Sequence, residues 1–128
     1  MTFGILLAIA LGGAIGSLAR HYLSSSIYAV TGNTFPWGIF VVNILGGLVM
    51  GLIVELGARK FNYAPETRAF LTTGILGGFT TFSTFSLESA MLITRGAYFY
   101  AAAYMIGSTS LSVLAVFAGF WIVRATYA

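Results

Sequence analysis

Long uncharged runs set the strongest limit on how this chain can fold. Only 7% of its 128 residues are charged, and almost the whole length falls into four stretches without Asp, Glu, Lys or Arg. These stretches are Thr2–Ala19, Tyr22–Val54, Ala69–Leu87 and Gly96–Val123. Soluble domains carry about a quarter charged residues, and about 20 consecutive apolar residues can cross a bilayer as a helix. The chain is therefore predicted to be an all-α integral membrane protein.

The four stretches predict four transmembrane helices in a single membrane domain, residues 1–128. The second stretch is too long for one crossing, and turn-forming residues 31–36 separate a link from the next helix. The predicted helix bounds are 2–22, 36–56, 65–94 and 97–124. The link at 23–35 is expected to be irregular or a short interfacial helix without a chemical role.

The third stretch is a poor continuous helix. Its segment from Gly74 to Ser86 contains three glycines and then a tail rich in hydroxyl and β-branched residues. A break near residues 77–80 is therefore expected. Non-helical backbone at membrane depth persists only where protein or a water-filled cavity satisfies its polar groups, so the break predicts an ion or substrate site.

Phenylalanines follow the expected break at helical spacing. Phe79, Phe82 and Phe85 recur every three residues beside a strip that carries hydroxyl groups. Phenylalanines at such spacing usually belong to a core, and this interpretation is kept for Phe79. Phe82 and Phe85 are predicted to face an aqueous path that Asn43 approaches from the second helix.

Asn43 and Arg20 each have two interpretations. Asn43 is the only side-chain amide within a predicted helix. It either makes an interhelical hydrogen bond that fixes packing, or presents an NH₂ donor to a passing anion. Arg20 continues a ridge of small residues on the first helix. It either extends to the lipid headgroups, or faces the protein and draws anions into a vestibule.

The last helix carries a line of hydroxyl groups. Its members are spaced by four residues and so share one face: Tyr100, Tyr104, Ser108 and Ser112. Serines on membrane helices commonly bond their own backbone carbonyls, so one serine alone indicates little. Four hydroxyl residues along one face predict a polar track.

Composition argues against several other classes of protein. With no cysteine and one histidine, disulfides, thiolate chemistry and zinc or haem sites are not expected. The net charge of +3 indicates contact with membrane lipids and is no argument for nucleic acid. An enzyme is not expected, because no base, nucleophile and orienting partner can be assembled at membrane depth.

The basic residues give only a small bias in orientation. Arg59, Lys60, Arg68 and Arg124 fall on one side, and Arg20 and Arg95 fall on the other. A chain with so small a difference could insert both ways. An antiparallel homodimer would then supply the inverted symmetry that a four-helix chain is too short to contain.

Three segments, 12–20, 41–47 and above all 77–86, closely resemble the Fluc/CrcB family of fluoride channels. The resemblance covers the whole chain. It implies an antiparallel, dual-topology homodimer with two pores in a bacterial inner membrane. It also implies passive fluoride export that reduces fluoride toxicity in the cell.

The resemblance also implies residue roles. The fluoride pathway would comprise Asn43, Phe82, Ser83, Thr84, Phe85, Glu88, Tyr104, Ser108 and Ser112, with Arg20 at the vestibule. The backbone carbonyls of Gly77 and Thr80 from both subunits would hold a structural sodium ion at the dimer interface.

Two alternatives stay open on the residues alone. A small proton-coupled multidrug exporter also has four helices, but it needs a membrane-embedded carboxylate. The first helix has no acid, and Glu88 is the sole candidate within a predicted span. The other alternative is a non-transporting packing subunit, for which the break and the polar track would serve no purpose.

Overall fold

The first apolar run forms one long helix. The computed structural model describes all residues, 1–128, and α1 spans Phe3–Thr31. The Thr2 side chain caps its start by accepting a hydrogen bond from the Ile5 amide at 3.1 Å. The helix ends at Gly32, which has a positive φ of 75° and donates its amide hydrogen to the Tyr28 carbonyl.

The predicted end of this helix at Tyr22, with an irregular or interfacial link to follow, is wrong. The hydroxyl groups of Ser26 and Thr31 bond carbonyls one turn back, at 2.8 and 3.1 Å, so the serine-rich segment satisfies its polar groups within the helix. No glycine or proline lies between Tyr22 and Gly32. Helix α1 therefore extends to within six residues of the next helix, α2, which begins at Trp37.

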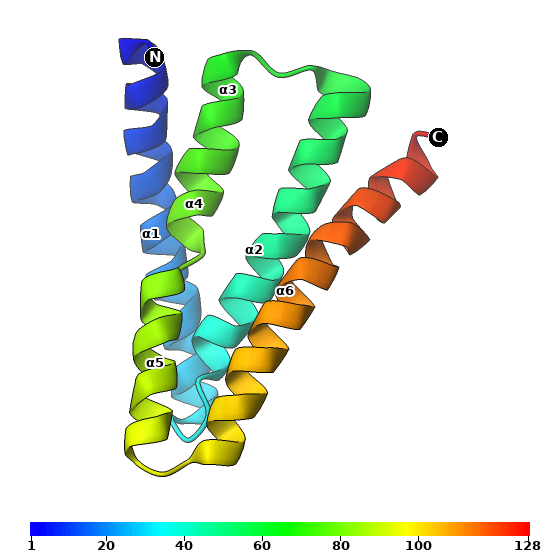
Figure 1. The fold of residues 1–128 in the computed structure, drawn as a ribbon. Coiled ribbons are helices and arrows are strands. Elements are labelled where there is room, and N and C mark those ends of the chain that lie inside the picture. The colour runs from blue at the N-terminus through cyan, green and yellow to red at the C-terminus, as the bar shows by residue number, and fades with distance from the viewer.

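The remaining chain is also helical (Figure 1). Helix α2 spans Trp37–Leu56 and continues as a π-helical turn, η1, over Gly57–Phe61. After a short connection come α3 (Pro65–Ala69), the π-helical η2 (Phe70–Leu76), α4 (Gly77–Phe79) and α5 (Phe82–Thr94). The last helix, α6, spans Tyr98–Thr126. Three helices are long and apolar enough to cross a membrane: Phe3–Thr31, Trp37–Phe61 and Tyr98–Thr126.

The third predicted helix is divided among shorter elements. Helix α4 ends at Phe79, Thr80 and Thr81 are extended, and α5 begins at Phe82. We call Thr80–Thr81 the interruption. It lies just after Gly77 and Gly78, which are themselves helical and so do not form it.

Glycines bring helices into backbone contact. A Cβ atom added at Gly78 would lie 2.6 Å from the Gly13 carbonyl oxygen, and one at Gly12 would lie 2.6 Å from that of Phe70. Helix α1 therefore packs closely along η2 and α4, as the ridge of small residues predicts. Similarly, a Cβ atom at Gly47 would lie 2.6 Å from the Ser112 carbonyl oxygen, where α2 packs on α6.

Most large apolar side chains face outward. Only 21 of the 128 residues are buried, while Leu18, Phe82 and Trp121 are at least 70% exposed. A small core of Ile39, Leu92, Ala101 and Tyr104 lies between α2, α5 and α6. Both chain termini lie at the end of the molecule opposite the α5–α6 turn (Figure 1). An apolar surface of this extent fits lipid or further protein.

Candidate functional site

The interruption is held by the side chain of Asn43 on α2. The Asn43 Nδ2 atom donates to the Thr81 carbonyl oxygen at 3.2 Å, and Oδ1 accepts from the Thr81 amide nitrogen at 2.9 Å. Both backbone polar groups of Thr81 are thus paired in a residue that is only 8% exposed. Of the two interpretations of Asn43, the structure supports the interhelical hydrogen bond. The amide nitrogen carries a second hydrogen that makes no hydrogen bond within the chain.

The interruption also frees carbonyl groups, among them those of Gly77 and Thr80. In a continuous helix the Gly77 carbonyl would accept from the Thr81 amide, which donates instead to Asn43. The Thr80 carbonyl would accept from the Thr84 amide, which donates instead to Thr81 Oγ1 at 3.1 Å. The two carbonyls to which the family resemblance gives a cation-binding role are therefore among those that lose their helical partners.

Arg20 faces the interruption. Its Nη1 atom donates to the Thr80 carbonyl oxygen at 3.3 Å, and the side chain is partly buried. This contact shows that Arg20 faces the protein. Because one guanidinium nitrogen is engaged by Thr80, part of the role of Arg20 is to stabilise a carbonyl that the helix no longer satisfies.

A groove of about 400 Å³ lies beside the interruption, between α2, α5 and α6. It contains five of the predicted pathway residues: Asn43, Phe82, Phe85, Ser108 and Ser112. The interruption itself forms part of the wall through Thr80 and Thr81. The structure thus brings an amide, two aromatic rings and two serine hydroxyls from three helices to one surface.

The polar track on α6 consists of hydroxyls without partners. Tyr104 Oη, Ser108 Oγ and Ser112 Oγ are buried, and none makes a hydrogen bond. Other hydroxyls in the chain bond the carbonyl one turn back, as those of Ser89 and Thr109 do at 2.8 Å. Buried polar groups are nearly always paired, and each unpaired one costs about 1–3 kcal/mol. Three in line indicate a place for an external hydrogen-bonding species.

The two phenylalanines predicted for the pathway contact each other but differ in burial. The ring centroids of Phe82 and Phe85 are 5.6 Å apart, and the Phe85 ring lies 5.2 Å from that of Tyr104. Phe85 is partly buried, whereas Phe82 is 79% exposed in the single chain. Phe79 packs near Gly46, where an added Cβ would meet its ring at 3.4 Å.

Four other predicted residues do not line the groove. Ser83 and Thr84 follow the interruption in the chain and contact the Thr81 hydroxyl. The Ser83 hydroxyl oxygen lies 3.4 Å from Thr81 Oγ1, and the Thr84 amide donates to Thr81 Oγ1. Glu88 lines a separate pocket of about 280 Å³ and accepts a hydrogen bond from the Tyr28 hydroxyl at 2.9 Å. Tyr104 meets the site through its contact with Phe85.

Tyr28 is a residue that sequence reasoning missed. Besides donating to Glu88, its hydroxyl accepts from the Ile39 amide, in the first turn of α2, at 3.3 Å. It thus joins α1, α2 and α5. The sequence did contain a signal that Tyr28 shares a face with Arg20. Gly12, Gly16 and Arg20 are spaced by four residues, and the same spacing arrives at Tyr28 if the helix continues through the serines.

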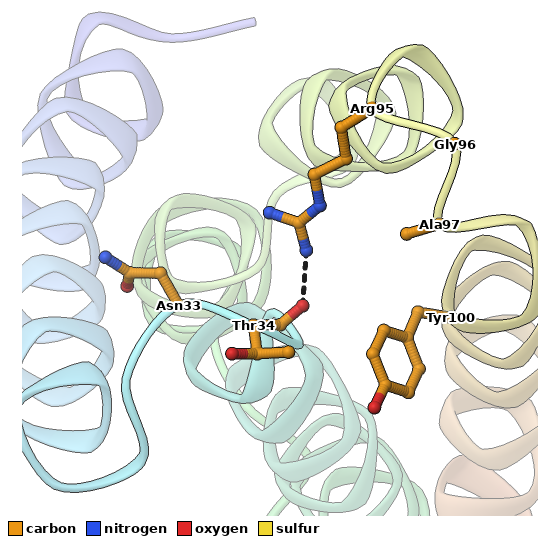
Figure 2. Close-up of a pocket in the computed structure, with 6 residues that line it drawn as sticks. All are labelled: Asn33, Thr34, Arg95, Gly96, Ala97 and Tyr100. Carbon is orange, nitrogen blue, oxygen red and sulfur yellow. Dashed lines mark hydrogen bonds between the residues drawn. The ribbon is translucent and has the colours of Figure 1, made fainter.

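The opposite end of the polar track opens into another pocket. Tyr100, the first hydroxyl of the predicted line, borders a volume of about 470 Å³ between the α1–α2 loop and the α5–α6 turn (Figure 2). In this pocket the Arg95 guanidinium donates to the Thr34 carbonyl oxygen and so ties the turn to the loop (Figure 2). Tyr100 therefore lies apart from the groove.

Comparison with known proteins gives consistent results. Residues 7–120 match the model of a family described as "CrcB-like protein, Camphor Resistance (CrcB)". A protein of Chelativorans sp. named "Fluoride-specific ion channel FluC" is 48% identical over 119 residues, which are 93% of this chain and 95% of the relative. Its namesake in Agrobacterium fabrum is 50% identical over 111 residues, covering 87% and 89% of the two chains. The Rhodospirillum centenum protein of the same name is 45% identical over 124 residues, covering 97% and 98%.

Removing the paired hydroxyl of Tyr28 and removing the unpaired hydroxyl of Tyr104 should have different effects on stability. Tyr28→Phe removes two hydrogen bonds and leaves the Glu88 carboxylate and the Ile39 amide without that partner, so we expect a loss of about 1–3 kcal/mol. Tyr104→Phe removes a hydroxyl that has no partner, so stability should be unchanged or slightly raised. Thermal unfolding of the two purified variants in one detergent compares them directly. Equal destabilisation by both would contradict the unpaired state of the Tyr104 hydroxyl.

Proposed function

The chain belongs to the CrcB family, and we propose that it is a passive, fluoride-selective ion channel that lets fluoride leave the cell and so reduces its toxicity. It is a multi-pass membrane protein, with a bacterial inner membrane as its proposed location. The observation that carries the proposal is the line of three buried, unpartnered hydroxyls on α6, two of which border the groove that also contains Asn43.

The groove supplies the donors that a small anion requires. Fluoride holds water strongly, so a pore must replace its hydration shell with several weak contacts. The free hydrogen of the Asn43 amide and the hydroxyls of Ser108 and Ser112 can donate to it, and Tyr104 continues the line. The edges of the Phe82 and Phe85 rings are electropositive and add to these contacts. No lysine or arginine lines the groove, so the anion meets no full charge there that would retain it.

Ser83, Thr84, Glu88 and Arg20 take supporting places in this proposal. Ser83 and Thr84 lie at the interruption, where they bond Thr81. Glu88 and its pocket lie beyond the groove, toward one end of the pathway. Arg20 attracts anions to a vestibule while one of its nitrogens bonds Thr80.

A second copy of the chain is needed to close the pathway. Phe82 is 79% exposed and Ser83, Ser86 and Leu87 are exposed beside it, so one wall of the path is open in a single chain. We propose that an antiparallel homodimer of dual topology covers this face and contains two pores. The near balance of basic residues between the two ends supports insertion in both orientations.

The freed carbonyls suit a structural sodium ion at the two-fold axis of this dimer. One chain offers two such oxygens, from Gly77 and Thr80, and a hard cation takes more oxygen ligands than that. Thr80 retains a lone pair after accepting from Arg20, and Gly77 is exposed. Two chains related by a two-fold axis would bring both pairs together. Sodium bound there would hold the subunits together and would not permeate.

Replacing sodium with a bulky organic cation during purification tests this assembly. The dimer should dissociate or lose fluoride flux, because the four carbonyl oxygens would be left without a cation of suitable size. Size-exclusion chromatography with light scattering measures the dimer fraction, and cross-linking between introduced cysteines reports the relative orientation. A parallel dimer, or one that is indifferent to the exchange, would count against the proposal.

Flux from liposomes that contain only the purified protein tests the function itself. Fluoride should leave down its gradient without nucleotide or a proton gradient, and chloride should leave far more slowly. The competing function is small proton-coupled multidrug export. It would appear as proton-driven movement of organic cations without fluoride flux, and that result would overturn the channel assignment.

Phe82 and Phe85 distinguish permeation from packing. Leucine or methionine in their place preserves apolar volume, and such swaps usually cost under about 1.5 kcal/mol. Each variant should therefore remain a folded dimer, but fluoride flux should fall sharply because the ring edge is lost. Phe79→Leu is the matched control and should retain flux, since Phe79 does not line the groove. Wild-type flux in folded Phe82 and Phe85 variants would return both residues to a packing role.

A further inference from the structure

A cluster of charges at the end of α2 and α6 has no part in the pathway. Glu55 Oε1 accepts hydrogen bonds from Arg59 Nε at 2.8 Å and from Arg124 Nε at 2.9 Å. The Glu55 side chain is only 11% exposed, whereas those of Arg59 and Arg124 are 39% and 54% exposed. One shielded carboxylate thus fixes two arginines that remain open to the surroundings.

Both guanidinium groups keep most of their donors free. Each bonds Glu55 through Nε, and the Nη1 and Nη2 atoms of Arg59 and Arg124 make no hydrogen bond in the structure. Lys60, exposed and adjacent to Arg59, adds an ammonium group. Two arginines share one carboxylate and Lys60 adds a third cation, so the group keeps a net positive charge. We call Arg59, Lys60 and Arg124 the basic cluster.

Aromatic rings surround the basic cluster. The Lys60 ammonium lies 4.7 Å from the centroid of the Tyr127 ring and 5.3 Å from that of Phe61, and it donates to the Tyr127 hydroxyl at 3.3 Å. The Arg124 guanidinium lies 5.4 Å from the centroid of the Phe120 ring. Mixed basic and aromatic side chains of this kind are typical of the level of the lipid headgroups.

The length of α2 places the cluster at that level. Its 20 residues span about 30 Å, which is about the thickness of the hydrocarbon core of a bilayer. Trp37 stands at the start of this helix as an interfacial anchor, and Glu55 stands near its end. The cluster is therefore about one hydrocarbon thickness from Trp37, at the opposite membrane surface.

We propose that the basic cluster binds the phosphate group of an anionic phospholipid. A planar guanidinium can hold two phosphate oxygens at once, and the Glu55 contacts orient two such groups before any ligand arrives. Lipid is favoured over a soluble anion because Phe117 and Trp121, on the same part of α6, are 60% and 70% exposed and offer apolar surface for acyl chains. If the chains insert in both orientations, each leaflet would contain one such site per dimer.

Native mass spectrometry of the delipidated full-length protein, titrated with phosphatidylglycerol or phosphatidylcholine, tests the site. Wild-type protein should bind phosphatidylglycerol more tightly. Arg59→Gln and Lys60→Gln should each weaken that binding about fivefold, the factor that corresponds to about 1 kcal/mol per basic residue, and should weaken phosphatidylcholine binding less, because its choline group offsets the phosphate charge. Both variants keep the Arg124–Glu55 pair, and thermal unfolding verifies that they fold.

Arg68→Gln is the matched control. It removes the same charge from exposed α3, which lies at the same end of the molecule (Figure 1), but Arg68 makes no side-chain contact with the cluster. This variant should bind phosphatidylglycerol like wild type. An equal loss in Arg68→Gln, or unchanged binding in both cluster variants, would overturn the proposal. Displacement of the lipid by millimolar inorganic phosphate would also overturn it, because the site would then recognise a free anion.

Discussion

The rest of the site depends on the reciprocal hydrogen bonds between Asn43 and Thr81, which stabilise the interruption between α4 and α5. An extended segment between two helices exposes amides and carbonyls that lipid cannot satisfy. Asn43 pairs both polar groups of Thr81, the Thr81 hydroxyl caps α5, and Arg20 reaches the Thr80 carbonyl. With these contacts in place the chain can change direction, and Phe82 and Phe85 are directed to the groove beside α2 and α6.

Much of this arrangement follows from the sequence because it rests on spacing and local chemistry. Hydroxyls four residues apart must share a face, and the structure places Tyr104, Ser108 and Ser112 in one buried line. A glycine pair followed by threonines predicts a break in the helix, but its position depends on tertiary packing. Gly78 is required for contact with the Gly13 carbonyl, so it stays helical and the interruption falls at Thr80 and Thr81.

Other features depend on partners that are distant in the chain, and the sequence does not reveal them. Residues 23–31 are rich in serine, which suggested a link, yet they are helical because serine and threonine hydroxyls bond carbonyls within the helix. The pairing of Tyr28 with Glu88 joins residues 60 positions apart. It places the Glu88 carboxylate in a pocket of its own and away from the groove, which local motif reading could not foresee.

The glycine contacts of α1 limit the insertions and deletions that this helix can accept. Backbone lies against backbone at Gly12 and Gly78, so α1 cannot turn about its axis without a collision. The same face delivers Arg20 to Thr80 and Tyr28 to Glu88. Inserting or deleting one residue between Gly12 and Arg20 would rotate everything beyond it by about 100° and displace it by about 1.5 Å along the axis. Both contacts would be lost in one step, so the length of α1 is constrained more tightly than the identity of its lipid-facing residues.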